Sequence, residues 1–193
     1  NEYGDTSKYC FSYNETDMER VISSVAERKS EIGVIFLSEM TEKFTNKILA
    51  VNDLEFHEIT RVKPHVFINR SHPLAGKTTV KARELFEYPY VAFTKKNNNT
   101  IQFSEEAILP EIEKFKKVVY VNDRASCYNV LANTNCVSTG SGILPDGCGD
   151  DRLISVPIED ALDIMRLGWI KQKDAALSEA AEKYIEILGD ILA

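Results

Sequence analysis

Polar stretches and short apolar runs alternate along the first part of the chain. Residues 9–13 (YCFSY) are aromatic and typical of a short strand. The spacing of Thr16 and Glu19 then matches a capping box, and apolar residues recur at helical intervals to about Lys29, which predicts a helix. Residues 31–37 (EIGVIFL) are almost continuously apolar, which is typical of a strand buried on both faces of a parallel sheet. Strand, helix and strand in this order predict a right-handed βαβ unit.

The second half of the chain continues this alternation. Apolar runs predict strands at 90–93 (YVAF), 118–121 (VVYV), 136–139, 153–156 and within 163–170 (DIMRLGWI). Residues 104–115 (SEEAILPEIEKF) predict a helix with a break near Pro110. Asn122 or Asp123 can cap a further helix that runs to about Ala132.

The C-terminal stretch predicts a last helix. Ser178 is a favourable N-cap residue, and the apolar residues after it recur at helical spacing. They predict one apolar stripe: Ala181, Tyr184, Ile185, Leu188, Ile191 and Leu192. Trp169, the one tryptophan, is expected to pack within the preceding strand.

The composition is that of a globular protein and argues against two kinds of partner. Hydrophobic residues make up 44% and charged residues 27% of the 193 positions. The net charge is −7, from 23 basic and 30 acidic residues, and such a surface repels a phosphate backbone. We therefore expect no nucleic-acid binding by this chain alone. No apolar run approaches the length of a membrane span, so no membrane partner is expected.

No residue pattern indicates a catalytic site, a metal site or a cofactor. The four cysteines lie far apart, so we expect reduced cytoplasmic thiols rather than zinc ligands. The three histidines accompany no hydrolase or metalloprotease motif. Residues 139–149 (TGSGILPDGCG) have the glycine spacing of a phosphate loop, but they follow a strand into a turn and open no helix. A nucleotide site is therefore excluded.

Polar residues that follow the predicted strands define the candidate binding site. In an open parallel α/β sheet, ligands bind beyond the carboxyl ends of the strands. This rule selects ten residues: Asn14, Thr16, Ser38, Thr94, Lys95, Asn122, Asp123, Ser126, Thr139 and Gly140. Thr16 and Asn122 can instead cap helices, and Lys95 can be a solvated surface residue. The sequence favours as ligand contacts the residues that have no visible local role: Ser38, Thr94 and Thr139.

The middle of the chain carries a distinctive block. Residues 66–93 (VFINRSHPLAGKTTVKARELFEYPYVAF) contain a strand, the turn His72-Pro73-Leu74-Ala75, a short helix, Tyr88-Pro89 and a second strand. In this order they resemble the effector-binding domain of LysR-type transcriptional regulators. Residues 31–37 look like the family's "DiGi" strand, with Glu31 in place of the usual Asp, and residues 154–188 are similar to its closing strand, crossover, strand and helix.

The residues of the H-P-L-A turn also have a plain structural interpretation. His72 is held extended before Pro73, and Leu74 can anchor the turn in the core, so His72 is not expected to be a ligand. Two features depart from the family pattern. Residues 133–136 (NTNC) replace a common G-x-G, where asparagine can still end a helix. Residues 1–3 look like the end of the family's first effector-domain helix, so we expect that the first strand, most of that helix and the DNA-binding domain are absent.

The resemblance implies an α/β, two-lobed, periplasmic-binding-protein-like (type II) fold, in which each lobe is a mostly parallel sheet flanked by helices. It implies that residues 1–61 and 163–193 form lobe I and residues 62–162 form lobe II. The effector is expected between the lobes. We expect a small polar metabolite there, and an anion in preference to a cation, because helix N-termini gather at this place. The resemblance also implies a homodimer or tetramer in the full-length protein, and DNA contact only through the missing winged helix-turn-helix.

Three classes of function are compatible with these observations. The favoured class is the effector-sensing regulatory domain of a cytoplasmic bacterial LysR-type regulator. An extracytoplasmic solute-binding protein of a transport system shares the two-lobed architecture, and the residues upstream of Asn1 would separate the two. The third class is an enzyme on the same fold, but no paired carboxylate, base–nucleophile set or cofactor loop supports it.

Overall fold

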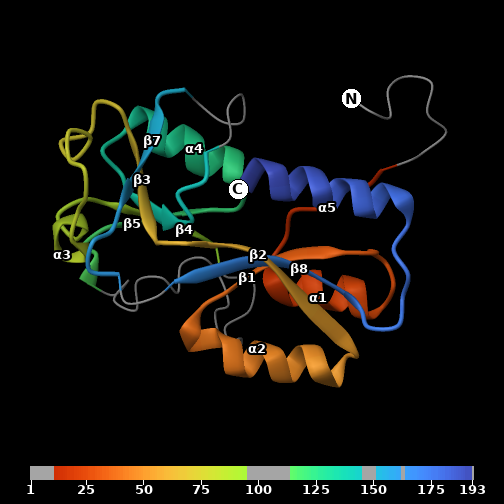
Figure 1. The fold of residues 1–193 in the computed structure, drawn as a ribbon. Helices are drawn as coiled ribbons and strands as arrows, with labels where there is room; N and C mark the ends of the chain where they lie inside the picture. Colours follow the sequence, from red (N-terminus) through yellow and green to blue (C-terminus); the bar gives the residue numbers. More distant parts are fainter. Residues whose placement is uncertain (1–10, 95–113, 145–150, 162–163, 193) are drawn as a thin grey trace, which may run out of the picture.

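A computed structural model describes residues 11–94, 114–144, 151–161 and 164–192 (Figure 1). In chain order the elements are α1 (Met18–Ala26), β1 (Gly33–Leu37), α2 (Glu39–Val51), β2 (Leu54–Val62), β3 (His65–Asn69), α3 (Ala82–Leu85), β4 (Tyr90–Phe93), β5 (Val118–Val121), α4 (Arg124–Asn133), β6 (Ser138–Gly140), β7 (Leu153–Pro157), β8 (Met165–Gln172) and α5 (Glu179–Leu192). We call the sheet of β1, β2 and β8, with its helices, the first lobe, and strands β3 to β7, with α3 and α4, the second lobe. The chain passes between the lobes from β2 to β3 and from β7 to β8.

The first lobe is a three-stranded sheet in the order β1-β8-β2. One apolar cluster joins α1, α2 and all three strands, with Val25, Leu37, Leu54 and Ile170 among its fully buried members. Along β1, buried residues alternate with half-buried ones, so the strand is fully covered on one face only. β1 and β2 precede the second lobe in the sequence, whereas β8 follows it. The sheet is therefore built from segments at opposite ends of the chain.

The strand pairing of the first lobe differs from the sequence expectation. β1 and β2 both pair with β8 in the antiparallel direction, whereas we expected a parallel βαβ unit. Residues 11–13 form no strand, and residues 9–10 lie outside the described residues. Phe11 and Tyr13 are exposed, so residues 11–13 do not contribute a buried strand to the sheet. The apolar character of β1 matches the prediction, but its partner strand comes from far along the chain.

The second lobe contains the two predicted strands β4 and β5, which pair in parallel as expected. Its other strands follow the order β6-β3-β7, with antiparallel pairing. A parallel bridge between Tyr90 and Val137 brings β4 beside the start of β6. β3 has apolar clusters on both sides, since Val66 and Ile68 belong to one cluster and Phe67 to the other. The carboxyl ends of β4 and β5 therefore lie at the same edge of this lobe.

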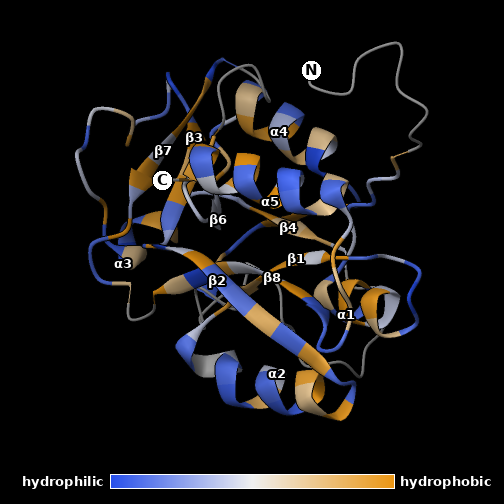
Figure 2. Cartoon of the chain, turned by 45° about the vertical axis from the view of Figure 1, so that its right-hand side comes forward, coloured by the Kyte–Doolittle hydropathy of each residue, from blue (hydrophilic) through white to orange (hydrophobic). Residues whose placement is uncertain are grey.

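The last helix begins as predicted but leaves apolar residues in water. The hydroxyl of Ser178 accepts a hydrogen bond from the backbone N–H of Ala181 at 3.2 Å, which caps α5. Ala181 is buried, whereas Tyr184, Ile187 and Ile191 are 39%, 44% and 60% exposed. Figure 2 shows hydrophobic segments between hydrophilic ones along this helix. The stripe predicted from the sequence is thus divided between an inner side and an accessible one.

Candidate functional site

The edge of the second lobe begins at the end of β4. The backbone N–H of Thr94 donates to the carbonyl oxygen of Val121 at 2.7 Å, and its hydroxyl donates to the same oxygen at 3.2 Å. Thr94 thereby closes the β4–β5 pair at its carboxyl end. Its side chain is accessible to water, so the hydroxyl can exchange this partner for a ligand. Lys95, the next predicted contact, lies outside the described residues.

Thr139 has a structural role that sequence reasoning missed. Its side chain is buried, and its hydroxyl lies 2.7 Å from the phenol oxygen of Tyr90. Gly140 is buried as well, and the neighbouring Ser138 hydroxyl donates to the carbonyl oxygen of Val91 at 3.1 Å. The hydroxyls of β6 therefore bind this strand to β4. Thr139 was favoured because it had no visible local partner, and Tyr90 is that partner.

The N-terminus of α4 is capped by Asp123. One carboxylate oxygen accepts from the backbone N–H of Ser126 and the other from its hydroxyl, both at 2.8 Å. These hydrogen bonds hold the pKa of Asp123 below its usual value, so the carboxylate keeps its charge. Asn122, the alternative cap, is exposed. Ser126 and Asp123 therefore bind each other at the point where both were predicted to contact a ligand.

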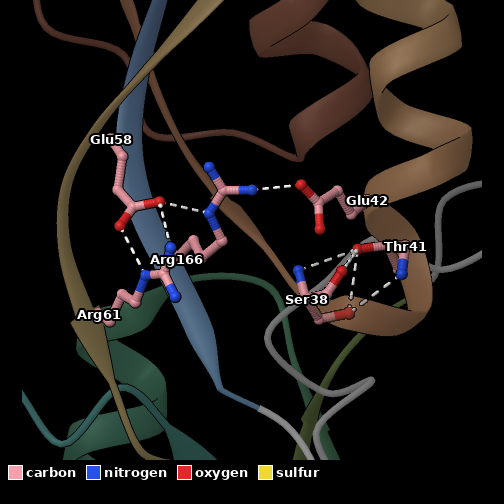
Figure 3. Close-up of polar contacts among 6 residues, drawn as sticks. All are labelled: Ser38, Thr41, Glu42, Glu58, Arg61 and Arg166. Atoms are coloured by element: carbon pink, nitrogen blue, oxygen red, sulfur yellow. Dashed lines mark hydrogen bonds and ion pairs between the residues drawn. The ribbon is translucent and has the colours of Figure 1, made fainter.

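Ser38 is the N-cap of α2, a role that the sequence analysis did not assign. Its hydroxyl accepts from the backbone N–H of Thr41 at 3.2 Å, and the Thr41 hydroxyl accepts from the backbone N–H of Ser38 at the same distance (Figure 3). The two hydroxyl oxygens lie 3.0 Å apart. This is a capping box in which threonine replaces the usual Glu or Gln. The expectation that Ser38 has no local role is therefore wrong.

A charged cluster, which sequence reasoning missed, lies beside this cap. The guanidinium of Arg166 on β8 binds the carboxylates of Glu42 on α2 and Glu58 on β2 (Figure 3). Arg61 also donates to Glu58, at 2.7 Å. Hydrogen bonds from Arg61 and Arg166 lower the pKa of Glu58. Arg166 is 108 and 124 residues away from Glu58 and Glu42, so no local signal could have placed it in the cluster.

The segment before α1 lies beside the edge of the second lobe. Glu15 binds Arg124, the first residue of α4, with Oε1 and Nε 2.5 Å apart. The flanking predicted residues Asn14 and Thr16 are exposed. Thr16 is not the cap of α1, because the side chain of Asp17 accepts from the backbone N–H of Arg20 at 3.0 Å. The structure thus brings Glu15 and Arg124 together, and each of them adjoins a predicted residue.

Three helix N-termini are occupied by side chains of their own helices. Asp17 caps α1, Ser38 caps α2 and Asp123 caps α4. Two of these caps are carboxylates, which take the backbone N–H groups that an anion would otherwise bind. Helix N-termini alone therefore do not make this edge attractive to an anion.

Among the described residues, no group of three or more His, Cys, Asp or Glu side chains could hold a metal ion. Cys127 and Cys136 are buried cysteines of the second lobe. His72 has the structural role that the sequence suggested: its Nδ1 accepts from the backbone N–H of Leu74 at 3.1 Å, and its Nε2 lies 3.3 Å from the carbonyl oxygen of Asn135. Leu74 is buried and anchors the turn, as expected.

The fold is a two-lobed α/β arrangement, and comparisons with known proteins place the chain in a family. A family described as the LysR substrate binding domain matches residues 10–193. The chain therefore belongs to this family, and the resemblance drawn from the H-P-L-A block is confirmed. A comparison with curated proteins found no match.

Solved structures agree with this assignment of the fold. The chain is similar to the effector-binding domain of QuiR in complex with shikimate, with a TM-score of 0.62 and 16% identity over 93% of this chain and 79% of that one. It is similar to HinK, a LysR family regulator from Pseudomonas aeruginosa, with a TM-score of 0.62 and 12% identity over 93% of this chain and 58% of that one. It is also similar to the regulatory domain of CcmR from Synechocystis in complex with 2-PG, with a TM-score of 0.59 and 16% identity over 92% and 80%.

Family and fold together define the class of function. LysR substrate binding domains are effector-sensing regulatory domains, and this chain is one of them. The alternative of a solute-binding protein of a transport system is not favoured, because the matching family is a regulatory one. No helix among the described residues has both the length and the apolar character needed to cross a membrane.

Proposed function

We propose that this domain binds a small polar effector between its two lobes, at the edge where residues 14–16, Thr94 and residues 122–126 lie. The observation that carries the proposal is the family match over residues 10–193, together with the Glu15–Arg124 contact between the lobes at this edge. We place the lobe boundaries where the sequence suggested, with residues 1–61 and 163–193 in one lobe and 62–162 in the other. Relatives of the same fold were solved with shikimate and with 2-PG, both small polar molecules, which supports an effector of that size.

Thr94, Asn14 and Asn122 are exposed polar residues at this edge. Thr94 is the best candidate for a direct contact. Its hydroxyl donates to the carbonyl oxygen of Val121, and that oxygen also accepts the backbone N–H of Thr94, so it keeps a hydrogen bond if the hydroxyl turns to a ligand. Ser38 and Thr139 become indirect contributors, since a ligand would have to displace a helix cap or a buried hydroxyl pair. We propose a sensor without catalytic chemistry that acts in the cytoplasm and reaches DNA through a separate winged helix-turn-helix.

We further propose that the domain self-associates as a homodimer. The accessible side of α5, formed by Tyr184, Ile187 and Ile191, supports this, since burying such residues against a second copy removes apolar surface from water. The full-length protein would then present its DNA-binding parts in pairs.

A thermal-shift screen of small carboxylic acids, hydroxy acids, amino acids and sugars tests the effector proposal. We expect at least one compound to raise the melting temperature, and we expect Thr94→Val to weaken that compound's binding by about tenfold or less, since one hydroxyl contact contributes about 1 kcal/mol. Thr78→Val, at an exposed threonine outside the strands, is the matched control. A broad screen without any stabilising compound contradicts the proposal.

A further inference from the structure

A carboxylate of the segment before α1 binds a cation of the other lobe. Glu15 lies in extended residues that lead into the first lobe, whereas Arg124 opens α4, 109 residues later and in the second lobe. The contact sits beside Asp123 and Ser126, at the edge where the effector is proposed to bind. The ion pair therefore spans the two lobes at the candidate site.

This ion pair is open to water and is easily replaced. The side chains of Arg124 and Glu15 are 39% and 50% exposed, and ion pairs with such exposure contribute little to stability. Arg166 provides a contrast: it is 27% exposed and is held by two carboxylates of its own lobe, Glu42 and Glu58. Another anion can take the place of Glu15 on Arg124 at a small cost, whereas the Arg166 cluster is fixed.

The neighbouring anion-binding groups are already engaged. The carboxylate of Asp123 takes the backbone N–H and the hydroxyl of Ser126, so the N-terminus of α4 is satisfied by its own side chain. Asp123 keeps its negative charge and repels a second anion from that position. An anionic ligand that reaches this edge is therefore directed to the guanidinium of Arg124.

We propose that Arg124 binds a carboxylate group of the effector and that Glu15 is a built-in competitor for the same guanidinium. The inference rests on the proposed function, because it assigns a ligand chemistry to the site between the lobes. Glu15 shows that a carboxylate fits against Arg124. A free carboxylate can engage two N–H groups of the guanidinium side by side, a geometry that adds specificity as well as energy.

This arrangement couples ligand binding to the contact between the lobes. When a ligand carboxylate takes Arg124, Glu15 is released and the direct link between the segment before α1 and α4 is lost. The apparent affinity for the ligand is lowered by the fraction of molecules in which Glu15 holds Arg124. Removal of the Glu15 charge therefore strengthens carboxylate binding, and removal of Arg124 weakens it.

The first experiment measures the guanidinium directly with sodium acetate as the probe and sodium chloride at equal ionic strength as the reference. The Nε–H signal of Arg124 is followed by NMR in the ¹⁵N-labelled domain and assigned by its loss in Arg124→Lys. We expect acetate to shift this signal more than chloride does, and Glu15→Gln to lower the midpoint acetate concentration about three- to tenfold. Glu186→Gln, which breaks an exposed ion pair with Lys183 on α5, is the matched control and should leave the midpoint unchanged. An unchanged midpoint in Glu15→Gln, or equal effects of acetate and chloride, overturns the proposal.

The second experiment compares small carboxylic acids with their uncharged amides in thermal-shift and calorimetric titrations. Any acid that binds should lose about tenfold affinity or more in Arg124→Met and gain affinity in Glu15→Gln, because a charged partner is lost or released. If acids bind Arg124→Met as tightly as the parent domain, or if only uncharged compounds bind, the carboxylate assignment is wrong while effector sensing stands. If no compound binds but acetate still competes with Glu15, the Arg124 site stands and the effector proposal fails.

Discussion

The imidazole of His57 stacks on the indole of Trp169, with ring centroids 4.2 Å apart and ring planes inclined by 12°. The two residues are direct partners across the β2–β8 pair. Nε2 of His57 also lies 2.9 Å from Glu55, whose carboxylate binds Lys171 at 2.8 Å. Lys171 and His57 together lower the pKa of Glu55. One face of the first sheet is thus organised around the single tryptophan, which lies in a strand as the sequence predicted.

His57→Ala should move the tryptophan emission to longer wavelength. The substitution removes the ring that covers one face of the indole, so water gains access to it, and we expect a loss of stability of about 0.5–1.5 kcal/mol. Because Trp169 is the only tryptophan, its fluorescence spectrum measures this site alone. His65→Ala is the control, and an unchanged spectrum in His57→Ala would contradict the stacked arrangement.

Acid should destabilise the second lobe through His72. Burial lowers the pKa of His72, so the folded state disfavours the protonated ring, whereas the unfolded chain takes up the proton near the ordinary value of 6.5. The contribution of the neutral ring to stability is complete above that value and is lost as the pH falls through the lowered pKa of the folded state. Urea unfolding at pH 7.5 and 5.5 should show a smaller difference for His72→Gln than for the parent domain. An equal difference in both would assign the acid sensitivity to other groups.

Gly168→Ala should be severely destabilising. A Cβ at this position would lie 2.2 Å from the carbonyl oxygen of His57 and 2.4 Å from the ring of Phe56, so β2 and β8 would have to separate. We expect a loss of about 3 kcal/mol or more in the free energy of unfolding. Gly189→Ala is the control, because nothing lies within 4 Å of its Cβ and alanine favours the α5 helix by about 0.5–1 kcal/mol. The two substitutions should shift the melting temperature in opposite directions.

Thr45→Val should stabilise the first lobe. The hydroxyl of Thr45 is buried and has no hydrogen-bond partner within the described part of the chain, and valine has nearly the same shape and helix propensity. Removal of an unsatisfied buried hydroxyl should raise the free energy of unfolding by about 1 kcal/mol in urea titrations. Thr41→Val, which removes half of the capping box of α2, should lower it. A destabilised Thr45→Val variant would show that the hydroxyl does find a partner.

Substitution of the accessible side of α5 should weaken self-association. Ile187→Asp and Ile191→Asp place charges on exposed apolar positions, so they should raise the dissociation constant of the dimer at least tenfold without unfolding the helix. Sedimentation velocity over a range of concentrations measures the change, and circular dichroism verifies the fold. Glu179→Gln, at the start of the same helix, is the control. An unaltered dissociation constant would place the interface elsewhere.

Local signals in the sequence identified the strands of the second lobe better than those of the first. Short apolar runs between turn residues gave both bounds of β4 and β5, and Asp123 and Ser178 were recognisable as caps. The partner of β1 could not be inferred in this way, because β8 arrives from more than a hundred residues away and periodicity says nothing about strand direction. α2 and β2 were not predicted, since the capping box of α2 has threonine at the third position and β2 mixes polar and apolar residues on both faces.

Within the candidate site, sequence position selected the edge but not the roles of its residues. Ser38 and Thr139 were favoured because their partners, Thr41 and Tyr90, were not evident from the chain. Arg124 and Glu15 were missed although each adjoins a selected residue, because an ion pair between lobes depends on how the lobes meet.

The position of β8 between β1 and β2 sets the order in which the newly made chain can fold. β8 leaves the ribosome about 110 residues after β2, a delay of roughly 5–20 s at ordinary rates of translation. During that interval the strands of the second lobe are already available to one another, whereas β1 and β2 have been made without the strand that joins them. Until β8 is made, Ile35, Leu37 and Leu54 lack Ile170, the residue of β8 that completes their core cluster, so the first lobe can reach its final packing only after the second lobe has been synthesised.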